Sequence, residues 1–156
     1  MLHRGLNVTA VGNLLNVCGR QKFRVEIDGI ANTGYREVEG LCVNIEVQDF
    51  REGTDIPGIS RTVPGLIHYG PLVLRNPVMC NAGNKDLWNW IKQVINGDDA
   101  RRNMSVIVMD RKGNDTLRLD LTSAWPSSWR LGKLDSHSGV PLIEEVVLQY
   151  ETLNIQ

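Results

Sequence analysis

Alternation of apolar and polar side chains along short runs is the feature that most constrains the fold of this 156-residue chain. Phe23, Val25 and Ile27 alternate with charged residues, and similar runs cover 41–48, 117–122 and 143–151. A period of two residues places the apolar side chains on one face of a strand. The sequence therefore predicts a mainly β fold built from half-buried strands.

The order of these runs along the chain predicts which strands are neighbours. We expect the runs at 23–28 and 41–48 to form a long hairpin. A second strand pair is expected between Leu66 and Leu74, and it should end at Pro77 because proline lacks the N–H that a central ladder needs. Pairs that are adjacent in sequence favour antiparallel pairing in an α+β or barrel-like domain.

The second half of the chain predicts one buried strand, one turn and one corner. Residues 104–109 are apolar except for Ser105, which indicates burial on both faces of a strand. Residues 111–114 carry turn-forming residues and should connect this strand to 117–122. The segment 125–129, with a tryptophan at each end, is interpreted as an aromatic corner.

A single helix is predicted over residues 84–96. Leu87, Ile91 and Val94 recur at helical spacing. Asn84 is a suitable N-cap and Gly97 a suitable stop. The apolar stripe is wide and aromatic, so we expect the helix to pack against the strands.

Composition limits the classes of function. The chain has a formal net charge of -1 with no basic run, which argues against a nucleic-acid-binding surface. No apolar stretch approaches the ~20 residues that span a bilayer, and the first residues do not have the pattern of a signal peptide. We therefore expect synthesis in the cytoplasm. Cys18, Cys42 and Cys80 are too widely spaced for a zinc pattern, and Cys42 and Cys80 are interpreted as small hydrophobic residues.

The search for catalytic residues gives no candidate. His3, His68 and His137 have no partner at metal-ligand spacing. Glu144 and Glu145 are neighbours on a predicted strand and should point to opposite faces. The four tryptophans could stack bases or sugars, but core packing is the better interpretation. No enzyme activity, cofactor or metal is expected.

An ordered series of motifs resembles a known family. The motifs are Phe23–Gly29, Glu37–Leu41, Phe50–Gly53, Val63–Gly65, Leu72–Arg75, Leu87–Trp90, Ser105–Asp110 with Gly113 and Asn114, Ala124–Pro126 and Ile143–Leu148. Their order is similar to that of the tail tube proteins of contractile phages and phage-derived contractile injection systems, the T4-type tail tube family. The resemblance covers about residues 22–153, and it departs from the usual pattern at Gly53-Thr54, at 75–77 and in the loop 135–142.

The resemblance implies a function as a structural subunit. Hexameric rings would stack into the inner tube of a contractile tail, a conduit for DNA or effector cargo, with sheath, baseplate or spike, and terminator proteins as partners. It implies an antiparallel β-barrel or sandwich-like subunit with one flanking helix, in a particle inside or outside the cell. Two alternatives stay open: a secreted hexameric ring protein of the type VI secretion kind, and a monomeric β-barrel that binds a small ligand.

Three sets of residues follow from this interpretation, within an N-terminal arm (1–20) and a tail-tube β domain (21–156). The arm and the loop 51–65 are long for a compact monomer, so we expect them to contact the next ring. The candidate inter-ring residues are Arg4, Asn7, Asn13, Arg51, Glu52 and Asp55. The candidate lumen-facing residues are Arg24, Glu26, Asn44, Glu46 and Arg118, and the structural motif residues are Gly40, Gly65, Trp90, Trp125 and Pro126.

Overall fold

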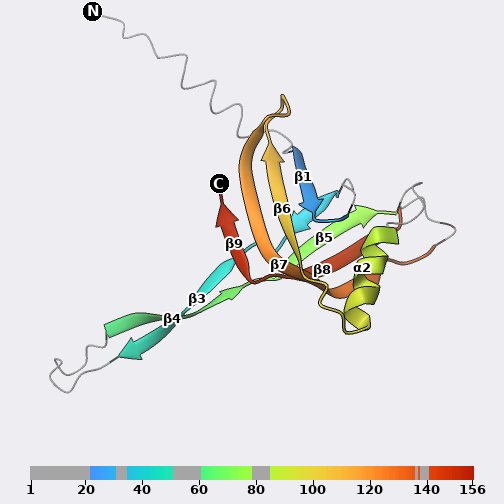
Figure 1. The fold of residues 1–156 in the computed structure, drawn as a ribbon. Helices are drawn as coiled ribbons and strands as arrows, with labels where there is room; N and C mark the ends of the chain where they lie inside the picture. Colours follow the sequence, from blue (N-terminus) through green and yellow to red (C-terminus); the bar gives the residue numbers. More distant parts are fainter. Residues whose placement is uncertain (1–21, 31–34, 51–60, 79–84, 136, 138–140) are drawn as a thin grey trace, which may run out of the picture.

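The computed structural model describes residues 22–30, 35–50, 61–78, 85–135, 137 and 141–156. They form one helix and nine strands, shown in Figure 1. In chain order these elements are β1 (Lys22–Ile27), β2 (Glu37–Glu39), β3 (Val43–Phe50), β4 (Arg61–Tyr69), β5 (Leu72–Pro77), α2 (Lys85–Ile95), β6 (Arg102–Met109), β7 (Asp115–Leu131), β8 (Ile143–Gln149) and β9 (Thr152–Ile155).

Seven strands form one antiparallel sheet in the order β1-β6-β7-β8-β5-β2, and β9 also pairs with β7. The 17-residue strand β7 connects the two halves of this sheet. Its first part lies between β6 and β9, and its second part pairs with β8. The sheet therefore has a first half (β1, β6, β7, β9) and a second half (β7, β8, β5, β2) that share one strand. The mainly β fold class with one flanking helix is confirmed.

The core lies between these two halves and the helix. Leu72, Leu74, Leu121, Val146 and Leu148 are fully or almost fully buried. The helix adds Leu87, Trp90 and Ile91 to the same cluster. Leu121 belongs to an alternating run, and in β5 and β8 every second residue is the buried one, so a period of two fixes which face is buried.

The helix agrees with its prediction to within one residue at each end. Gly97 has φ 85°. Its N–H donates to the carbonyl of Val94, and the N–H of Asp98 donates to the carbonyl of Gln93. These two bonds are the Schellman arrangement that ends a helix at a left-handed residue. The predicted N-cap, Asn84, lies outside the described residues.

A separate two-stranded hairpin, formed by β3 and β4, projects from the body of the molecule (Figure 1). Every residue of β3 is exposed. The pairing runs from Val43–Tyr69 to Phe50–Arg61, with a bulge near Ile45 and Val47. Of the predicted loop 51–65, residues 61–65 belong to β4, and the other ten lie outside the described residues.

Two predicted pairings are wrong. The run at 23–28 pairs with β6, and the run at 41–48 pairs with β4, so these two runs do not form a hairpin together. β4 and β5 are consecutive but unpaired, because β5 lies between β2 and β8. Alternation predicts the buried face of each strand but carries no information about its neighbour.

The C-terminal third differs from expectation at two places. The segment 125–129 does not end a strand, because β7 continues through it to Leu131 with a register shift between Pro126 and Ser128. The last predicted strand, 143–151, is confirmed as β8, which ends two residues earlier at Gln149, and the strand β9 that follows it was not predicted. The predicted strand 104–109 is confirmed with four consecutive buried residues, Met104 to Ile107, and the turn at 111–114 connects it to β7.

Candidate assembly surfaces

A charged face covers the first half of the sheet on the side opposite to the core. Arg24 and Glu26 lie on β1, where they alternate with the buried Val25 and Ile27. The guanidinium of Arg24 donates two hydrogen bonds to Asp115, of 3.1 and 2.9 Å, and one to Glu26 at 3.0 Å. This set belongs to β1 and the start of β7.

The same face continues across β6 and β7. Arg118 donates to Asp120 at 2.9 Å and to the hydroxyl of Ser105 at 2.8 Å, and it lies 3.7 Å from Glu26. Ser105 in turn donates to Asp120 at 2.6 Å. The bond from Ser105, followed by Arg118, holds the pKa of Asp120 below its usual value. This polar face consists of Arg24, Glu26, Ser105, Asp115, Arg118 and Asp120.

Two apolar side chains lie within the polar face: Met109, whose sulfur is 3.9 Å from the guanidinium of Arg24, and Ile107. Ile107 is directly paired with Arg24 on one side and with Arg118 on the other, and it is completely buried. Cross-strand partners point to the same face, so the two arginine side chains cover Ile107 with their methylene stems. The face therefore presents mainly paired charges to solvent.

A second charged cluster lies on β2, β5 and β8. Arg75 is 2.7 Å from Glu39, 2.8 Å from Glu145 and 3.5 Å from Glu37. Its hydrogen bonds to Glu39 and then to Glu145 raise the pKa of Arg75 above its usual value. This cluster fixes the short strand β2 at the edge of the sheet.

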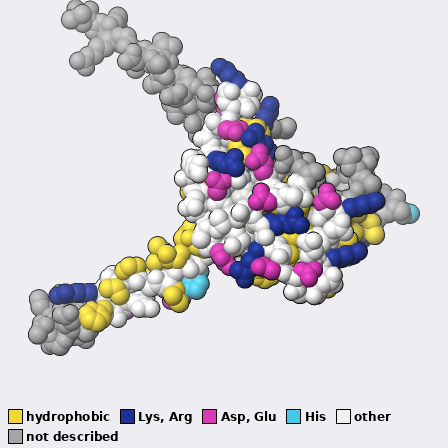
Figure 2. Space-filling model, in the orientation of Figure 1, with side chains coloured by type: hydrophobic (Ala, Val, Ile, Leu, Met, Phe, Trp, Pro, Cys, Tyr) yellow, Lys and Arg dark blue, Asp and Glu magenta, His cyan; other side chains and the backbone are white. Residues whose placement is uncertain are grey.

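The projecting hairpin carries exposed apolar side chains on both faces; Phe50 and Val63 lie on one face, and a longer apolar row lies on the other. Val43, Ile45 and Val47 lie in this row, and their exposed fractions are 48, 53 and 72%. The register places Pro64 and Ile67 on the same face. At the base of the hairpin this face meets the core, where Tyr69 contacts Tyr150 at a ring distance of 5.6 Å. We call Val43, Ile45, Val47, Pro64 and Ile67 the hairpin face; yellow side chains along the projection in Figure 2 mark exposed apolar area on this hairpin.

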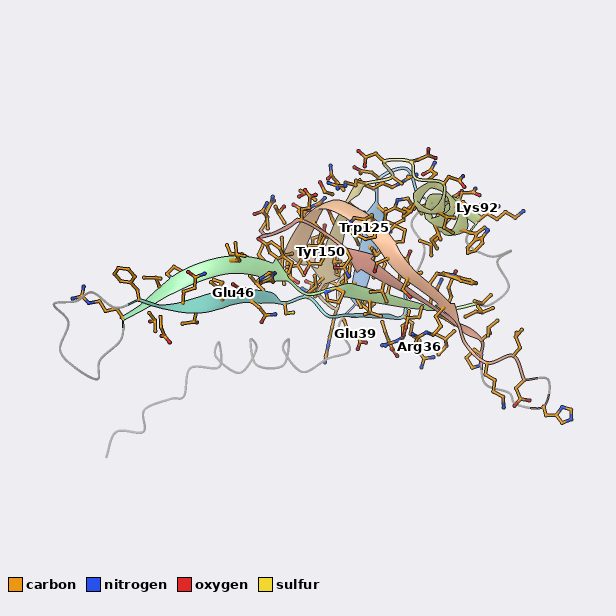
Figure 3. All side chains as sticks on the ribbon, turned by 90° about the horizontal axis from the view of Figure 1, so that it is seen from below. Arg36, Glu39, Glu46, Lys92, Trp125 and Tyr150 are labelled. Carbon is orange, nitrogen blue, oxygen red and sulfur yellow. The ribbon has the colours of Figure 1, made fainter. Side chains whose placement is uncertain are left out.

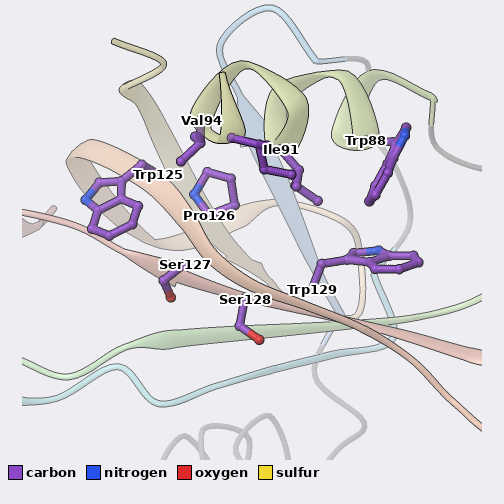
Figure 4. A pocket seen from close by; sticks show the side chains of 9 residues that line it. Trp88, Ile91, Val94, Trp125, Pro126, Ser127, Ser128 and Trp129 are labelled. Atoms are coloured by element: carbon purple, nitrogen blue, oxygen red, sulfur yellow. The ribbon is translucent and has the colours of Figure 1, made fainter. Parts of the chain in front are cut away.

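A groove of about 340 Å³ lies between α2 and the second part of β7 (Figure 4). Trp88 of the helix and Trp129 of the strand have ring centroids 5.0 Å apart, and both are more than one-third exposed. Ile95 borders the groove and is 70% exposed. The indole N–H of Trp129 donates to Glu144 at 2.6 Å. The groove is therefore a mainly apolar surface that the described residues leave exposed, with two contacting aromatic rings in its walls.

The predicted lumen-facing residues are divided between two places. Arg24, Glu26 and Arg118 are brought together on the polar face. Asn44 and Glu46 lie instead on the hairpin, where Glu46 contacts His68 at 2.8 Å. Figure 3 shows Glu46 on the projection, away from the helix side of the body. The predicted inter-ring residues Arg4, Asn7, Asn13, Arg51, Glu52 and Asp55 lie outside the described residues.

The structural motif residues have identifiable physical roles. Gly40 has φ 93°, and a Cβ there would lie 2.1 Å from the carbonyl oxygen of Pro71. A Cβ at Gly65 would lie 3.1 Å from the side chains of Glu46 and Gln48. Trp90 is completely buried.

The remaining aromatic and cysteine predictions are confirmed only in part. The indole of Trp90 donates to the carbonyl of Ala100 at 2.5 Å. Trp125 is half-buried and Pro126 is buried, but Trp88 and Trp129 border the groove rather than the core. Cys42 is exposed rather than packed as a small hydrophobic residue, and Cys18 and Cys80 lie outside the described residues.

Sequence reasoning missed the hairpin face and the groove. Val43, Ile45 and Val47 alternate as regularly as the core strand residues do, so their pattern gives no sign that the body leaves them uncovered. Among the described residues there is no helix long and apolar enough to cross a membrane and no cluster of three potential metal ligands.

These surfaces define a class of protein: a β-rich chain whose described strands include free sheet edges and exposed apolar side chains, the features of subunits that pair with other chains. A family model described as T4-like virus tail tube protein gp19 matches residues 20–154. The chain belongs to this family and is a tail tube protein. The predicted resemblance is confirmed.

Solved structures show the same fold at low sequence identity. A chain of the PVC extracellular contractile injection system, in its extended sheath-tube complex, is 19% identical with a TM-score of 0.75; the match covers 86% of this chain and 88% of that one. A chain of the PVC sheath/tube terminator complex is 18% identical with a TM-score of 0.74 and covers 100% and 99%. Hcp1 from Salmonella typhimurium is 15% identical with a TM-score of 0.57 and covers 86% and 85%. No curated protein sequence matches the chain.

Proposed function

We propose that this chain assembles into stacked hexameric rings that form the inner tube of a contractile phage tail or injection system. The observation that supports this proposal most strongly is the form of the first half of the sheet. One of its faces packs on the core, the other is polar, and it has two free edges. No described strand pairs with the outer edge of β1 or of β9. Free edges are sites for pairing with another chain, and a repeated heterologous contact closes into a ring.

The strand directions support closure through these edges. β1, β6, β7 and β9 are antiparallel to their neighbours in that order. If β9 of one copy lies beside β1 of the next copy, these two strands are also antiparallel, so the antiparallel order continues from one copy to the next. A closed sheet would then turn its polar face toward the central channel, because the other face is filled by the core and the helix.

This arrangement puts Arg24, Glu26 and Arg118 in the lumen, together with Asp115 and Asp120. Their charges are paired within hydrogen-bond distance, so the lumen would offer few unpaired charges or apolar groups to passing DNA or protein cargo. The placement of Asn44 and Glu46 in the lumen stays a prediction. A structural role without catalysis fits the family and the paired state of these groups.

The arm 1–20 and the hairpin that carries loop 51–60 remain our candidates for contacts between rings, including Arg4, Asn7, Asn13, Arg51, Glu52 and Asp55. Sheath, baseplate and terminator proteins are the proposed partners, since the fold neighbours come from such complexes. A particle assembled in the bacterial cytoplasm and used in a phage tail or injection device fits this role.

A proline at the edge of β9 tests ring closure. The backbone of Gln156 exchanges two hydrogen bonds with Arg118, of 2.8 and 3.1 Å, so the N–H of Ile155 points away from β7. Ile155→Pro removes this outward donor and is tolerated on an edge strand, whereas the matched control Ile155→Thr keeps it. We expect rings and tubes in negative stain for the wild type and Ile155→Thr, and folded monomers for Ile155→Pro. Rings formed equally by Ile155→Pro would contradict closure through β9.

A further inference from the structure

The groove between α2 and β7 is bordered by a free sheet edge. β6 pairs with β7 only as far as Ala124. From Trp125 to Leu131, β7 pairs with β8 on one side, and no described strand pairs with its other side. Apolar walls next to unpaired backbone groups are the features that receive an added β-strand, because the backbone supplies hydrogen bonds and the pockets receive alternate side chains.

The same chain carries a strand pair that fits this description. The hairpin face is apolar and exposed, and both outer edges of the hairpin are unpaired among the described strands. Hairpin and groove lie at opposite ends of the molecule in two perpendicular views (Figures 1 and 3). They cannot meet within one copy, but they can meet head to tail between copies, which is the geometry of a propagating assembly.

The charges of the two surfaces are complementary. Lys92 lies four residues after Trp88 and three before Ile95, so it belongs to the same exposed helix stripe as these two groove residues. Asp49 lies two residues beyond Val47, on the same side of β3 as the hairpin face. Neither side chain forms an ion pair within the described part of the chain.

We propose that the β3–β4 hairpin of one copy adds to the free edge of β7 in a second copy and seats the hairpin face over Trp88 and Trp129, with Asp49 near Lys92. The inference rests on the proposed function, since it names the receiving surface of a contact in the assembly. In this single contact the groove of the second copy would bury the hairpin face, and the hairpin would fill the groove.

Disulfide trapping between two single-cysteine proteins tests this directly. In a background with Cys18, Cys42 and Cys80 replaced by serine, one protein carries Val47→Cys and the other carries Ile95→Cys. The two are mixed as subunits, assembled and oxidised. We expect a covalent dimer of the two variants as the main cross-linked product. The control pairs Val47→Cys with Lys112→Cys, on the distant turn between β6 and β7, and should give no dimer above background.

Charge reversal tests the same contact in the wild-type cysteine background. Lys92→Glu and Asp49→Lys should each raise the concentration needed for assembly by about tenfold or more, since like charges would then face each other. The double variant Lys92→Glu, Asp49→Lys should restore assembly toward the wild-type value, which a general folding defect would not do. Lys112→Glu controls for the change in net charge.

The outcomes separate this inference from the proposed function. Normal rings and tubes without the Val47–Ile95 dimer, or with no effect of Lys92→Glu, overturn the inference alone and leave the groove open to another protein such as the sheath. Absence of any annular species in the wild type overturns the proposed function as well. A specific dimer together with charge-swap rescue supports the hairpin as the occupant.

Discussion

Strand β1, in the first half of the sheet, and strand β3 of the hairpin have nearly the same sequence pattern but opposite environments. Val25 on β1 is 2% exposed, and Val106 on β6 is 3% exposed. Val47 on β3, in an equally regular alternation, is 72% exposed. Two strands alone are marginally stable in water. The comparison teaches that alternation fixes which side chains share a face of a strand but not whether the same chain buries that face.

Replacement of Trp90 should have the largest effect on the stability of the subunit. Trp90→Ala removes a completely buried side chain that also bonds the carbonyl of Ala100. We expect the free energy of unfolding to fall by about 3–5 kcal/mol, measured by urea unfolding of dispersed subunits. Trp88→Ala, on the exposed side of the same helix, should cost about 0.5–1.5 kcal/mol, the range for an aromatic pair. Equal losses in the free energy of unfolding for the two variants would contradict the greater burial of Trp90.

Gly40 should be the next most sensitive position. Gly40→Ala places a Cβ against the backbone of Pro71 and keeps a positive φ of 93°. We expect a loss of about 2–4 kcal/mol from the combined strain and overpacking. Gly113→Ala has a similar φ of 91° but open space around the Cβ, and it should lose only about 1–2 kcal/mol. Thermal unfolding of the two variants measures the difference, and equal losses would exclude the contact with Pro71.

Asp120 should give the polar face a dependence on pH. Its pKa is lowered in the folded subunit by Ser105 and then Arg118. The stabilisation is complete above the ordinary carboxyl pKa and is lost as pH falls through the lowered folded value. Asp120→Asn should flatten the acid side of the stability curve, and Ser105→Ala should flatten it in part. An acid-side slope that does not change in Asp120→Asn would contradict this origin.

Replacement of valine by threonine should have the smallest effect on subunit stability in the hairpin and a clearly larger effect in the core. Val47→Thr on the hairpin should change subunit unfolding by no more than about 0.5 kcal/mol. Val106→Thr buries a hydroxyl in the core and should cost about 1–3 kcal/mol. Tube formation should respond differently. For each kcal/mol of subunit stability lost, Val47→Thr should reduce tube formation more than Val106→Thr does. Chemical unfolding and sedimentation of assembled material measure the two quantities separately.

Sequence predicted faces and element types more successfully than pairings. The helix, the strand at 104–109 and the buried side of β8 followed from periodicity, because periodicity reports which side chains share a face. The partner of β1 could not be predicted, since β6 lies about eighty residues away and alternation is identical for any partner. Five residues were predicted to face one lumen. The structure joins Arg24, Glu26 and Arg118 on one surface, but it places Asn44 and Glu46 on the hairpin. Trp88 and Trp129 could not be separated from the core tryptophans, because helical spacing does not tell a docked stripe from its exposed margin.

Hydrogen exchange of the hairpin amides tests the central claim most directly, that β3 and β4 are stabilised by another copy. In dispersed subunits we expect slow exchange in β6 and β7 and fast exchange in β3 and β4. In assembled tubes β3 and β4 should become protected to a degree comparable with the core strands. Equal protection of the hairpin in dispersed subunits, or fast exchange that persists in tubes, would contradict the account.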